Sequence, residues 1–416
     1  MSPQHHIDDR RKARLGTRSG TRPASFLTNL VHSPRKLWLR RALFQIHLWA
    51  GIFLTLYIVT IALTGSILVF EDEFSATALP AGLHRYDPQH TATVPTVMNA
   101  LLEACPTCTV TNLITPSPAS PAYRLRATDR EHHQLNFVAD PVTSAIHAQP
   151  RTWVEWVHDL HIYLLLGEAH GEQINGIGAV ILLILTLSGI VLWWRGLKNW
   201  SRGLGLSFRH NWRRINYDAH NAIGFWTLLI VAWWALSGVY FAWYRQVVAA
   251  VSLISPLRGM NSPALPQLPT YTGHHASLET ILTAAHQASP QGRLYSVSDP
   301  SLATPVVYVL MDLRAPGDFS HRDIITLDTH TARPLTVWHY GQNHTLGDWF
   351  IWSMHPLHFG TLWGLPFKIL WFLAGLSLAV LAITGVLMYW NRYLRHRLGK
   401  TGLTTIHGAF KYSVSG

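Results

Sequence analysis

The stretch H-L-W-A-G at residues 47–51 returns later in the chain as H-N-A-I-G at residues 220–224. A glycine follows eighteen residues after each of these histidines, and in both copies a small hydroxyl residue precedes it, giving the pairs Thr64-Gly65 and Ser237-Gly238. Both stretches open long apolar segments. The chain therefore repeats a histidine placed near the end of a membrane-length helix.

A second pair of segments repeats in the same order. W-V-E-W-V-H-D-L-H occupies residues 153–161, and W-F-I-W-S-M-H-P-L-H occupies residues 349–358. Each leads into another apolar segment, and these segments carry the pairs Ser188-Gly189 and Thr384-Gly385. Ionisable residues beside or within membrane helices are costly and usually mark function. Histidines repeated in this way indicate a membrane-embedded cofactor, and haem is the one we expect.

The composition predicts a membrane protein. Of the 416 residues, 48% are hydrophobic and only 13% are charged. A spanning helix needs about 20 largely apolar residues, and four segments provide them: residues 37–72, 173–195, 216–244 and 366–392. The first begins too late and runs too long for a cleaved signal peptide. We expect an α-helical membrane protein with four transmembrane helices in two parallel repeats.

The net charge of +11 is distributed unevenly along the chain. Basic residues cluster at residues 10–41, 195–214 and 392–400. Because cytoplasmic loops are enriched in lysine and arginine, we expect both termini and the central loop to be cytoplasmic. The basic clusters are explained by their place in the predicted cytoplasmic segments, so we do not expect the protein to bind nucleic acid.

The segments between the spans complete the predicted organisation. Cytoplasmic segments are a disordered tail at 1–34, a basic loop at 196–215 and a tail at 393–416; extracytoplasmic segments are domains at 75–150 and 245–345 and histidine helices at 152–170 and 346–365. Within the two domains, side-chain patterns predict helices at 96–104 and 278–287 and strands at 122–127, 133–138, 305–311 and 323–327. Glycines after each histidine helix predict a break before the next span.

Cys105 and Cys108 are the only cysteines, in the sequence C-P-T-C of the first extracytoplasmic domain. In an oxidising compartment such a pair can form a small disulfide loop. A redox pair that passes electrons is the other interpretation. The second domain has no counterpart, so we favour a structural disulfide or unused thiols.

The depth of His47 and His220 predicts a shared cofactor site. Each lies six residues beyond an arginine, Arg41 or Arg214, which is about 9 Å along a helix at 1.5 Å per residue. Two imidazoles on opposite faces of a porphyrin can hold a b-type haem between helices. We expect these two histidines to ligate one haem near the cytoplasm.

The paired histidines of the outer segments predict a second site. The i, i+3 spacing puts both members of each pair on one helix face. We expect His161 and His358 to ligate a second haem, with His158 and His355 as the next choice and a crossed pairing of His158 with His358 as a further one. Direct metal binding is a competing interpretation, and nearby tryptophans could flank a haem or a docked ligand: Trp153, Trp156, Trp349 and Trp352.

Two further stretches point to a known family. F-V-A-D-P-V-T at residues 137–143 and I-T-L-D-T-H-T at residues 325–331 resemble the closing strand and turn of PepSY domains. Together with the H-x-x-x-G…T-G spans and the H-D-L-H-x-x-L-L-L-G-E segment, residues 37–395 resemble the PepSY-associated transmembrane family. That family includes iron-regulated inner-membrane proteins and ferric-siderophore reductases of the ferrioxamine-reductase type.

The resemblance implies two small α+β PepSY-like domains outside a bacterial inner membrane, and a ferric siderophore as the electron acceptor. One-electron reduction would release the iron, because hard oxygen ligands hold ferrous iron less tightly than ferric iron. No G-x-G-x-x-G motif follows a predicted strand, so we expect electrons from a membrane quinol or a separate reductase.

The expected function is therefore that of an oxidoreductase with two b-type haems, which carries electrons outward across the membrane. Two alternatives remain open: a non-enzymatic PepSY membrane protein that binds or inhibits a peptidase, and a transporter with parallel repeats. The absorbance spectrum of the purified protein separates the haem oxidoreductase from both alternatives.

Overall fold

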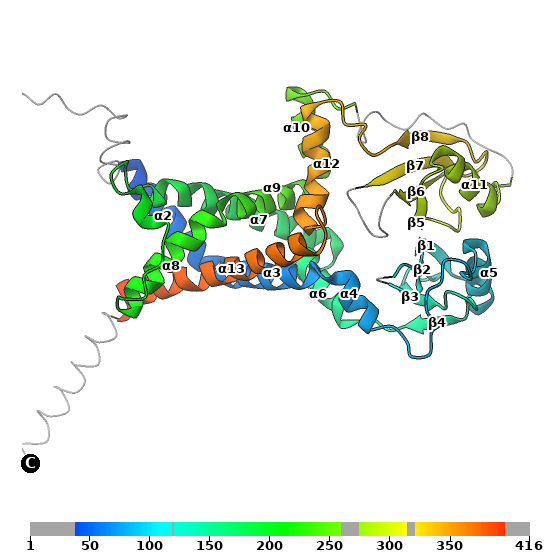
Figure 1. Cartoon of the computed structure of the whole chain (residues 1–416), viewed down its shortest axis with the longest axis horizontal. Helices are drawn as coiled ribbons and strands as arrows, with labels where there is room; N and C mark the ends of the chain where they lie inside the picture. The colour runs from blue at the N-terminus through cyan, green and yellow to red at the C-terminus, as the bar shows by residue number, and fades with distance from the viewer. Residues whose placement is uncertain (1–37, 119, 259–273, 314–320, 396–416) are drawn as a thin grey trace, which may run out of the picture.

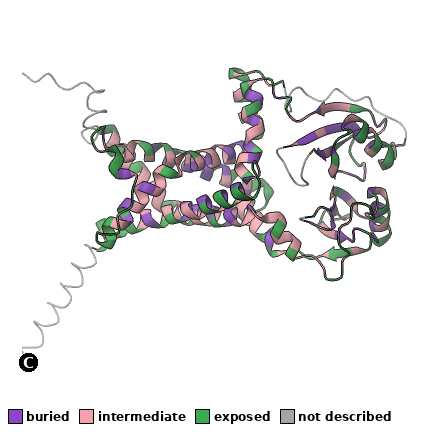
Figure 2. Ribbon diagram, in the orientation of Figure 1, coloured by how far each residue is buried: buried purple, intermediate pink, exposed green. Residues whose placement is uncertain are grey.

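The computed structural model describes residues 38–395, apart from residues 119, 259–273 and 314–320. A bundle of long helices carries a β-sheet beyond one of its ends (Figure 1). Buried residues occur along the bundle and within the sheet (Figure 2). The tail for which we predict disorder, residues 1–34, lies outside the described residues, and so does most of the carboxyl-terminal tail.

Two helices are each long and apolar enough to cross a membrane. They are α7 (Glu168–Trp193) and α13 (Leu365–Tyr389), the second of which continues into a π-helical turn, η4 (Trp390–Leu394). Few polar side chains interrupt either helix, so a bilayer core can surround them without leaving charged groups in hydrocarbon.

Two further apolar segments are each divided by a bend. α2 (Trp38–Phe53) meets α3 (Thr55–Leu68) at 65°, and α8 (Trp212–Trp226) meets α9 (Leu228–Ala242) at 64°. The chain is thus a helical membrane protein with two candidate spans, or four when each bent pair counts as one.

Threonine side chains lie at both bends. The hydroxyl of Thr55 donates to the carbonyl of Gly51 at 2.6 Å, and the hydroxyl of Thr227 donates to the carbonyl of Ile223 at 2.8 Å. Such a bond to the carbonyl four residues back often accompanies a helix bend, although Thr186 makes the same bond within the unbroken helix α7. The predicted segments gave no indication of these bends.

Packing between the helices crosses from one half of the chain to the other. α7 packs against α9, and α13 packs against α3, while α2 and α8 lie against α7 and α13. Their shared core consists of apolar side chains: Ile58, Ala62, Leu182, Leu185, Val231, Ala235, Leu378 and Ala379. Small residues permit close approach at several crossings; at Gly176, for example, an added Cβ would lie only 2.6 Å from that of Ala242.

The predicted histidine helices are α6 (Trp153–Tyr163) and α12 (Leu346–Phe359). Each begins with a capping box, in which a threonine and an acidic residue three positions later satisfy each other's backbone N–H groups. Each ends at a residue in the left-handed region, Leu164 with φ 51° or Gly360 with φ 71°. These ends confirm the predicted breaks before α7 and α13.

The segments that we predict to be extracytoplasmic form one antiparallel sheet of eight strands, in the order β4-β3-β2-β1-β5-β6-β7-β8. Its strands are β1 (Thr109–Ile114), β2 (Tyr123–Thr128), β3 (Gln134–Ala139), β4 (Ile146–Gln149), β5 (Arg293–Ser298), β6 (Val306–Asp312), β7 (Arg322–Asp328) and β8 (Pro334–Trp338). The four predicted strands correspond to β2, β3, β6 and β7. Pairing of Leu113 in β1 with Val297 in β5 joins the two sets of strands, which we had predicted as separate domains.

Two helices cover the face of the sheet that points away from the bundle (Figure 1): α5 (Val94–Ala104) and α11 (Leu278–Ala288). Both lie where the sequence predicts helices. Their apolar sides pack on alternate strand residues to form two hydrophobic cores. Shorter helices connect the sheet, the bundle and the central loop: α4 (Glu71–Thr77), α10 (Tyr244–Ile254) and η3 (Trp200–Gly203).

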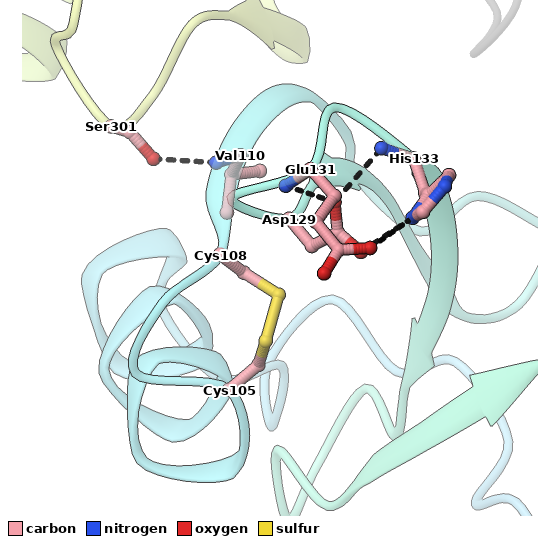
Figure 3. The surroundings of a disulfide bond; sticks show 7 residues. All are labelled: Cys105, Cys108, Val110, Asp129, Glu131, His133 and Ser301. Atoms are coloured by element: carbon pink, nitrogen blue, oxygen red, sulfur yellow. Dashed lines mark hydrogen bonds and ion pairs between the residues drawn. A yellow bond between two sulfur atoms is a disulfide. The ribbon is translucent and has the colours of Figure 1, made fainter.

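Cys105 and Cys108 form a disulfide bond where α5 turns into β1 (Figure 3). Cys108 is buried in the core beneath α5. Two residues further on, the backbone N–H of Val110 donates to the hydroxyl of Ser301 at 2.7 Å, which links the two sets of strands. The bond therefore closes a tight connection inside a packed region, as the structural interpretation predicts.

Candidate functional site

His47 on α2 and His220 on α8 line one cavity of about 1460 Å³. The cavity lies at the end of the bundle away from the sheet, where Figure 1 shows α2 and α8. Its walls are mostly apolar side chains from α2, α7, α8 and α13. The structure thus brings together two histidines that lie far apart in the sequence, one from each half of the chain.

Hydroxyl groups on neighbouring helices hold both rings. The Nδ1 of His47 lies 2.9 Å from the Oγ of Ser188 on α7, and the Nδ1 of His220 lies 3.0 Å from the Oγ1 of Thr384 on α13. These hydroxyls belong to the Ser188-Gly189 and Thr384-Gly385 pairs. Each pair therefore serves the inner histidine of its own half of the chain.

His161 on α6 and His358 on α12 form a second pair, on the sheet side of the bundle. Their ring centroids lie 6.4 Å apart at an interplanar angle of 60°. The Nδ1 of His161 lies 2.9 Å from the Oγ1 of Thr64, and the Nδ1 of His358 lies 2.7 Å from the Oγ of Ser237. The remaining two small-residue pairs thus serve the outer histidines.

The hydrogen bonds determine which ring nitrogen carries the proton. Each of the four hydroxyls also donates its own hydrogen to a backbone carbonyl within its helix; for Thr64 that acceptor is the carbonyl of Thr60, at 2.7 Å. The hydroxyl oxygen must then accept from the Nδ1–H of the imidazole. The Nε2 of each ring is left with its lone pair, and no described residue bonds to it. This neutral tautomer is the one that binds a metal.

The sequence comparison covers all four of these histidines and their hydroxyl partners. The model of the PepSY-associated TM region family matches residues 44–392. The chain belongs to this family. No curated protein matches it.

In this PepSY-associated TM protein, burial keeps the outer histidines neutral. Burial, with a smaller contribution from the neighbouring His158, lowers the pKa of His161 to about 4. Burial, with smaller contributions from His161 and His355, lowers the pKa of His358 to about 3. Both rings are therefore uncharged near pH 7, and neutral imidazole is the form that ligates iron.

The separation of the outer rings fits one metal ion between them. Two nitrogen ligands, each about 2 Å from a metal on opposite sides, put their ring centres about 6 Å apart. The observed 6.4 Å is close to that distance. By contrast, no group of three or more His, Cys, Asp or Glu side chains among the described residues could hold a metal ion. The outer pair suits a metal whose other ligands come from a cofactor.

Glycines leave room beside the rings. A Cβ added at Gly65 would come within 2.9 Å of the Cε1 of His161, so this glycine allows the imidazole to lie against α3. Gly51 and Gly224, each four residues after an inner histidine, line the cavity, and a Cβ added at Gly51 would meet no atom within 4 Å. The H-x-x-x-G motifs therefore leave open space on the same wall as the two inner histidines, where a flat cofactor could lie.

Arginines line the inner cavity as well: Arg40, Arg41, Arg213 and Arg392. Arg40 already donates to carbonyls at the end of α7, including that of Val191 at 2.7 Å. Guanidinium groups pair readily with carboxylates, so Arg41 and Arg213 could hold the propionates of a porphyrin. These residues were not predicted as cofactor ligands, although basic clusters at both positions are evident in the sequence.

The second members of the outer histidine pairs have different surroundings. His355 is buried among aromatic rings, with centroid distances of 5.2 Å to Phe241 and 4.9 Å to Phe359. His158 is one-third exposed, and its Nδ1 lies 3.3 Å from the Oδ1 of Asp159. The hydroxyls of Thr64 and Ser237 contact His161 and His358 instead. The geometry thus favours His161 with His358 as the ligating pair.

The four tryptophans of the histidine helices contact other groups. Trp153 packs on Phe74 at 5.4 Å, and Trp156 lies under Arg151 at 4.2 Å. Trp349 contacts Trp352 at 5.5 Å. Trp352 also lies 6.1 Å from Tyr340, which follows β8. All four tryptophans therefore pack against other side chains of the chain itself.

Proposed function

We propose that this chain is a dihaem b-type transmembrane electron-transfer protein that reduces ferric siderophores in the periplasm and so releases their iron. One observation carries the proposal: four histidines on four helices form two pairs, one lining a single cavity and the other in ring contact, and each has its Nδ1 held by the hydroxyl of a Ser/Thr-Gly pair. Such a shell, repeated four times, fixes ring orientation and tautomer as a haem ligand requires.

The chain's own residues would hold and orient two haems, which supply reversible one-electron transfer when bound. His47 and His220 would ligate the inner haem iron, and His161 and His358 the outer one. The hydroxyl groups restrain the rings, apolar walls exclude water from the inner site, and the glycines of the H-x-x-x-G motifs leave space for the porphyrin. The two sites lie at opposite ends of the bundle, so electrons can pass from one side of the membrane to the other.

The architecture we propose has four spans in two parallel repeats, with two PepSY-like units fused into the observed sheet. Matched bends of 65° and 64° and matched histidine–hydroxyl contacts support the repeats. Asp140 and Asp328, in the stretches that resemble PepSY turns, accept backbone N–H groups of their own turns. The proposed location is a bacterial inner membrane with both termini in the cytoplasm.

The direction of transfer follows from this orientation. The outer histidine pair lies beside the sheet, where a periplasmic ferric siderophore would accept an electron. Reduction weakens the hold of hard oxygen donors on the iron. Electrons would enter at the inner cavity from a membrane quinol or a separate reductase.

An absorbance spectrum of the purified protein tests the proposal. We expect a reduced-minus-oxidised signal of b-type haem and a ratio of two haems per chain. Reduction by dithionite followed by addition of a ferric siderophore should reoxidise the haems and yield ferrous iron. A protein that contains no haem after expression with haem supplied would instead favour a peptidase-binding protein or a transporter.

Reporter fusions test the proposed topology. A reporter fused after Lys400 or inserted near Lys198 is expected to read as cytoplasmic, because basic residues surround both positions. Reporters inserted near Pro118 or Pro263 should read as periplasmic. Alkaline phosphatase and green fluorescent protein report opposite sides of the membrane, so each position can be measured twice. A cytoplasmic reading at Pro118 or Pro263 would contradict the four-span arrangement.

Replacing Ser188 with alanine is expected to weaken haem binding at the inner site about 10- to 100-fold, as loss of an outer-shell partner does. The change removes only the hydroxyl that accepts from the Nδ1 of His47. Ser377→Ala is the matched control, because the Ser377 hydroxyl bonds only the carbonyl of Ala374 on its own helix. Haem retention after dilution measures the effect, and equal retention in both variants would argue against the role of Ser188.

A further inference from the structure

Two helices, α10 and α12, form an arm at the sheet end of the bundle. α10 follows the span helix α9 after the single residue Trp243, and α12 leads back toward α13. Both helices run across the bundle rather than along it (Figure 1). At 1.5 Å per residue, the eleven residues of α10 extend about 16 Å. The tip of the arm therefore lies close to the level at which α9 ends.

The two helices of the arm are packed on each other. Val247, Val248 and Val251 of α10 share one hydrophobic core with Ile351 and Met354 of α12. This contact uses one side of α10, and the opposite side is left open. The arm is thus a pair of antiparallel helices that the bundle holds at one end only.

A hydrogen bond closes the tip of the arm. The backbone N–H of Gly347 donates to the Oγ of Ser255 at 2.9 Å. Ile254 directly precedes Ser255, and Leu346 directly precedes Gly347. The last residues of α10 and the first residue of α12 therefore meet at the same point.

The tip carries the most exposed large apolar side chains of the described residues. Ile254 is 90% exposed, Leu253 88% and Leu346 84%. In the eight strands and the two helices that cover them, the most exposed large apolar side chain is Tyr308, at 42%. Leu229, on the outer surface of the span helix α9, is 81% exposed. The tip thus resembles the lipid-facing surface of the spans and differs from the part of the chain that carries the sheet.

The composition of α10 also indicates a membrane environment. Its polar side chains lie in the first turn, apart from Ser252, and the other residues are valine, alanine, leucine and isoleucine. A helix that is apolar on nearly every side is normally buried. The aromatic and basic residues at its beginning, Trp243, Tyr244 and Arg245, are of the types enriched where a chain crosses the membrane surface.

We propose that this arm lies in the surface of the bilayer on the sheet side, with Leu253, Ile254 and Leu346 inserted at the boundary between lipid headgroups and acyl chains. Interfacial helices bury an apolar face about 5–10 Å into this region. Continuity with the spans favours lipid over a second copy of the chain, because the arm leaves α9 and returns to α13, which the same bilayer surrounds. The inference requires insertion into a membrane but no haem, so it goes beyond the proposed function.

The first half of the chain carries a different helix at the equivalent position. α4 follows α3 as α10 follows α9, but it has only seven residues and begins with Glu71, Asp72 and Glu73. Three consecutive acidic residues are costly to place among acyl chains. The lipid contact is therefore confined to the half that contains α12, where it would fix the tilt of the helix that carries His358.

Spin-label accessibility in bilayer nanodiscs tests the proposal on the full chain. Ile254→Cys and Leu346→Cys can be labelled selectively, because Cys105 and Cys108 are joined in a disulfide bond. We expect both labels to collide more often with oxygen, which concentrates in lipid, than with a water-soluble nickel chelate. The ratio of the two collision rates should correspond to a depth of about 5–10 Å.

Two matched labels calibrate the measurement. Leu229→Cys reports a lipid-facing position of a span, and Tyr308→Cys reports an exposed position of the sheet. A label at Ile254 or Leu346 that behaves like the one at Tyr308 would overturn the proposal. Dipolar broadening that disappears on dilution with unlabelled protein would show that a second copy covers the tip, and would overturn it as well.

A charged variant provides a second measurement. Leu253→Asp combined with Ile254→Asp should move the label at Leu346 toward water, because carboxylates are costly at this depth. Ser252→Asp is the control, since Ser252 lies outside the apolar tip, and it should leave the label in place. An unaltered label in the double variant would contradict the lipid contact. Lipid-exposed labels on a protein that binds no haem would overturn the proposed function alone.

Discussion

Replacing His220 with alanine is expected to lower the haem content from two per chain to about one. One of the two histidines that would hold the inner haem would be missing, and alanine leaves a gap in a cavity that already holds open space beside Gly51. His161 and His358 lie at the other end of the bundle, held by Thr64 and Ser237, so the outer haem should remain. The haem-to-protein ratio and the amplitude of the reduced-minus-oxidised spectrum measure the loss.

His47→Ala is expected to give the same result, because both rings line one cavity and have equivalent hydroxyl partners. His210→Ala is a matched control, since His210 is an exposed histidine of the central loop. Full haem occupancy in both His47→Ala and His220→Ala would show that the inner pair does not ligate iron. Loss of both haems in either variant would show that the two sites do not fold independently.

Replacing His161 or His358 with alanine is expected to abolish reduction of a ferric siderophore. The outer haem would be lost, and no electron could pass from the inner site to the sheet side of the bundle at a useful rate. Dithionite should still reduce the inner haem, because His47 and His220 are unchanged. Stopped-flow reoxidation by a ferric siderophore, with ferrous iron trapped by a chelator, measures the effect.

The neighbouring histidines provide the comparison. His158→Ala and His355→Ala should retain both haems and shift the midpoint potential of the outer one, because each ring lies three residues from a member of the outer pair and contributes to its surroundings. Reduction at the normal rate in His161→Ala and His358→Ala would refute the assignment. A pair of inert variants at His158 and His358 would instead support the crossed arrangement.

Much of the fold follows from side-chain pattern alone. The helices α7 and α13 appear as long apolar runs, and α5, α11 and the central strands of each half appear as short periodic segments. The bends at Thr55 and Thr227 do not, because threonine occurs in many straight helices; Thr186 makes the same bond to the carbonyl one turn back within the unbroken helix α7. The position of a span could be predicted, but its shape could not.

The joined sheet shows a similar limit. The strands β2, β3, β6 and β7 could be predicted, whereas the pairing of β1 with β5 could not. Leu113 and Val297 meet across that junction although they are far apart in the sequence. Such pairing depends on how the bundle holds the two halves, and that information is not local to either strand.

At the candidate site, the four histidines and the four small-residue pairs were all evident in the sequence, but the contacts between them were not. Pairs of small residues in membrane helices usually allow close helix packing. That interpretation describes Gly238, whose added Cβ would lie 3.0 Å from that of Ala179. The hydroxyls beside the glycines also accept from the histidines, and this role depends on which helices are neighbours. The equal spacing of Thr64 after His47 and of Ser237 after His220 was the available signal.

Packing across the two halves has a consequence for how the protein is made. α3 and α7 come from the first half of the chain, yet α3 packs on α13 and α7 packs on α9, both from the second half. During synthesis the face of α7 that packs on α9 must therefore stay exposed to lipid until α9 is inserted, and the face of α3 that packs on α13 until α13 is inserted. A ligand held between His47 and His220 can be enclosed only after that moment. Any enzyme that delivers it must act on the completed polypeptide. A prematurely terminated chain would lack α13 and could not form the complete cavity.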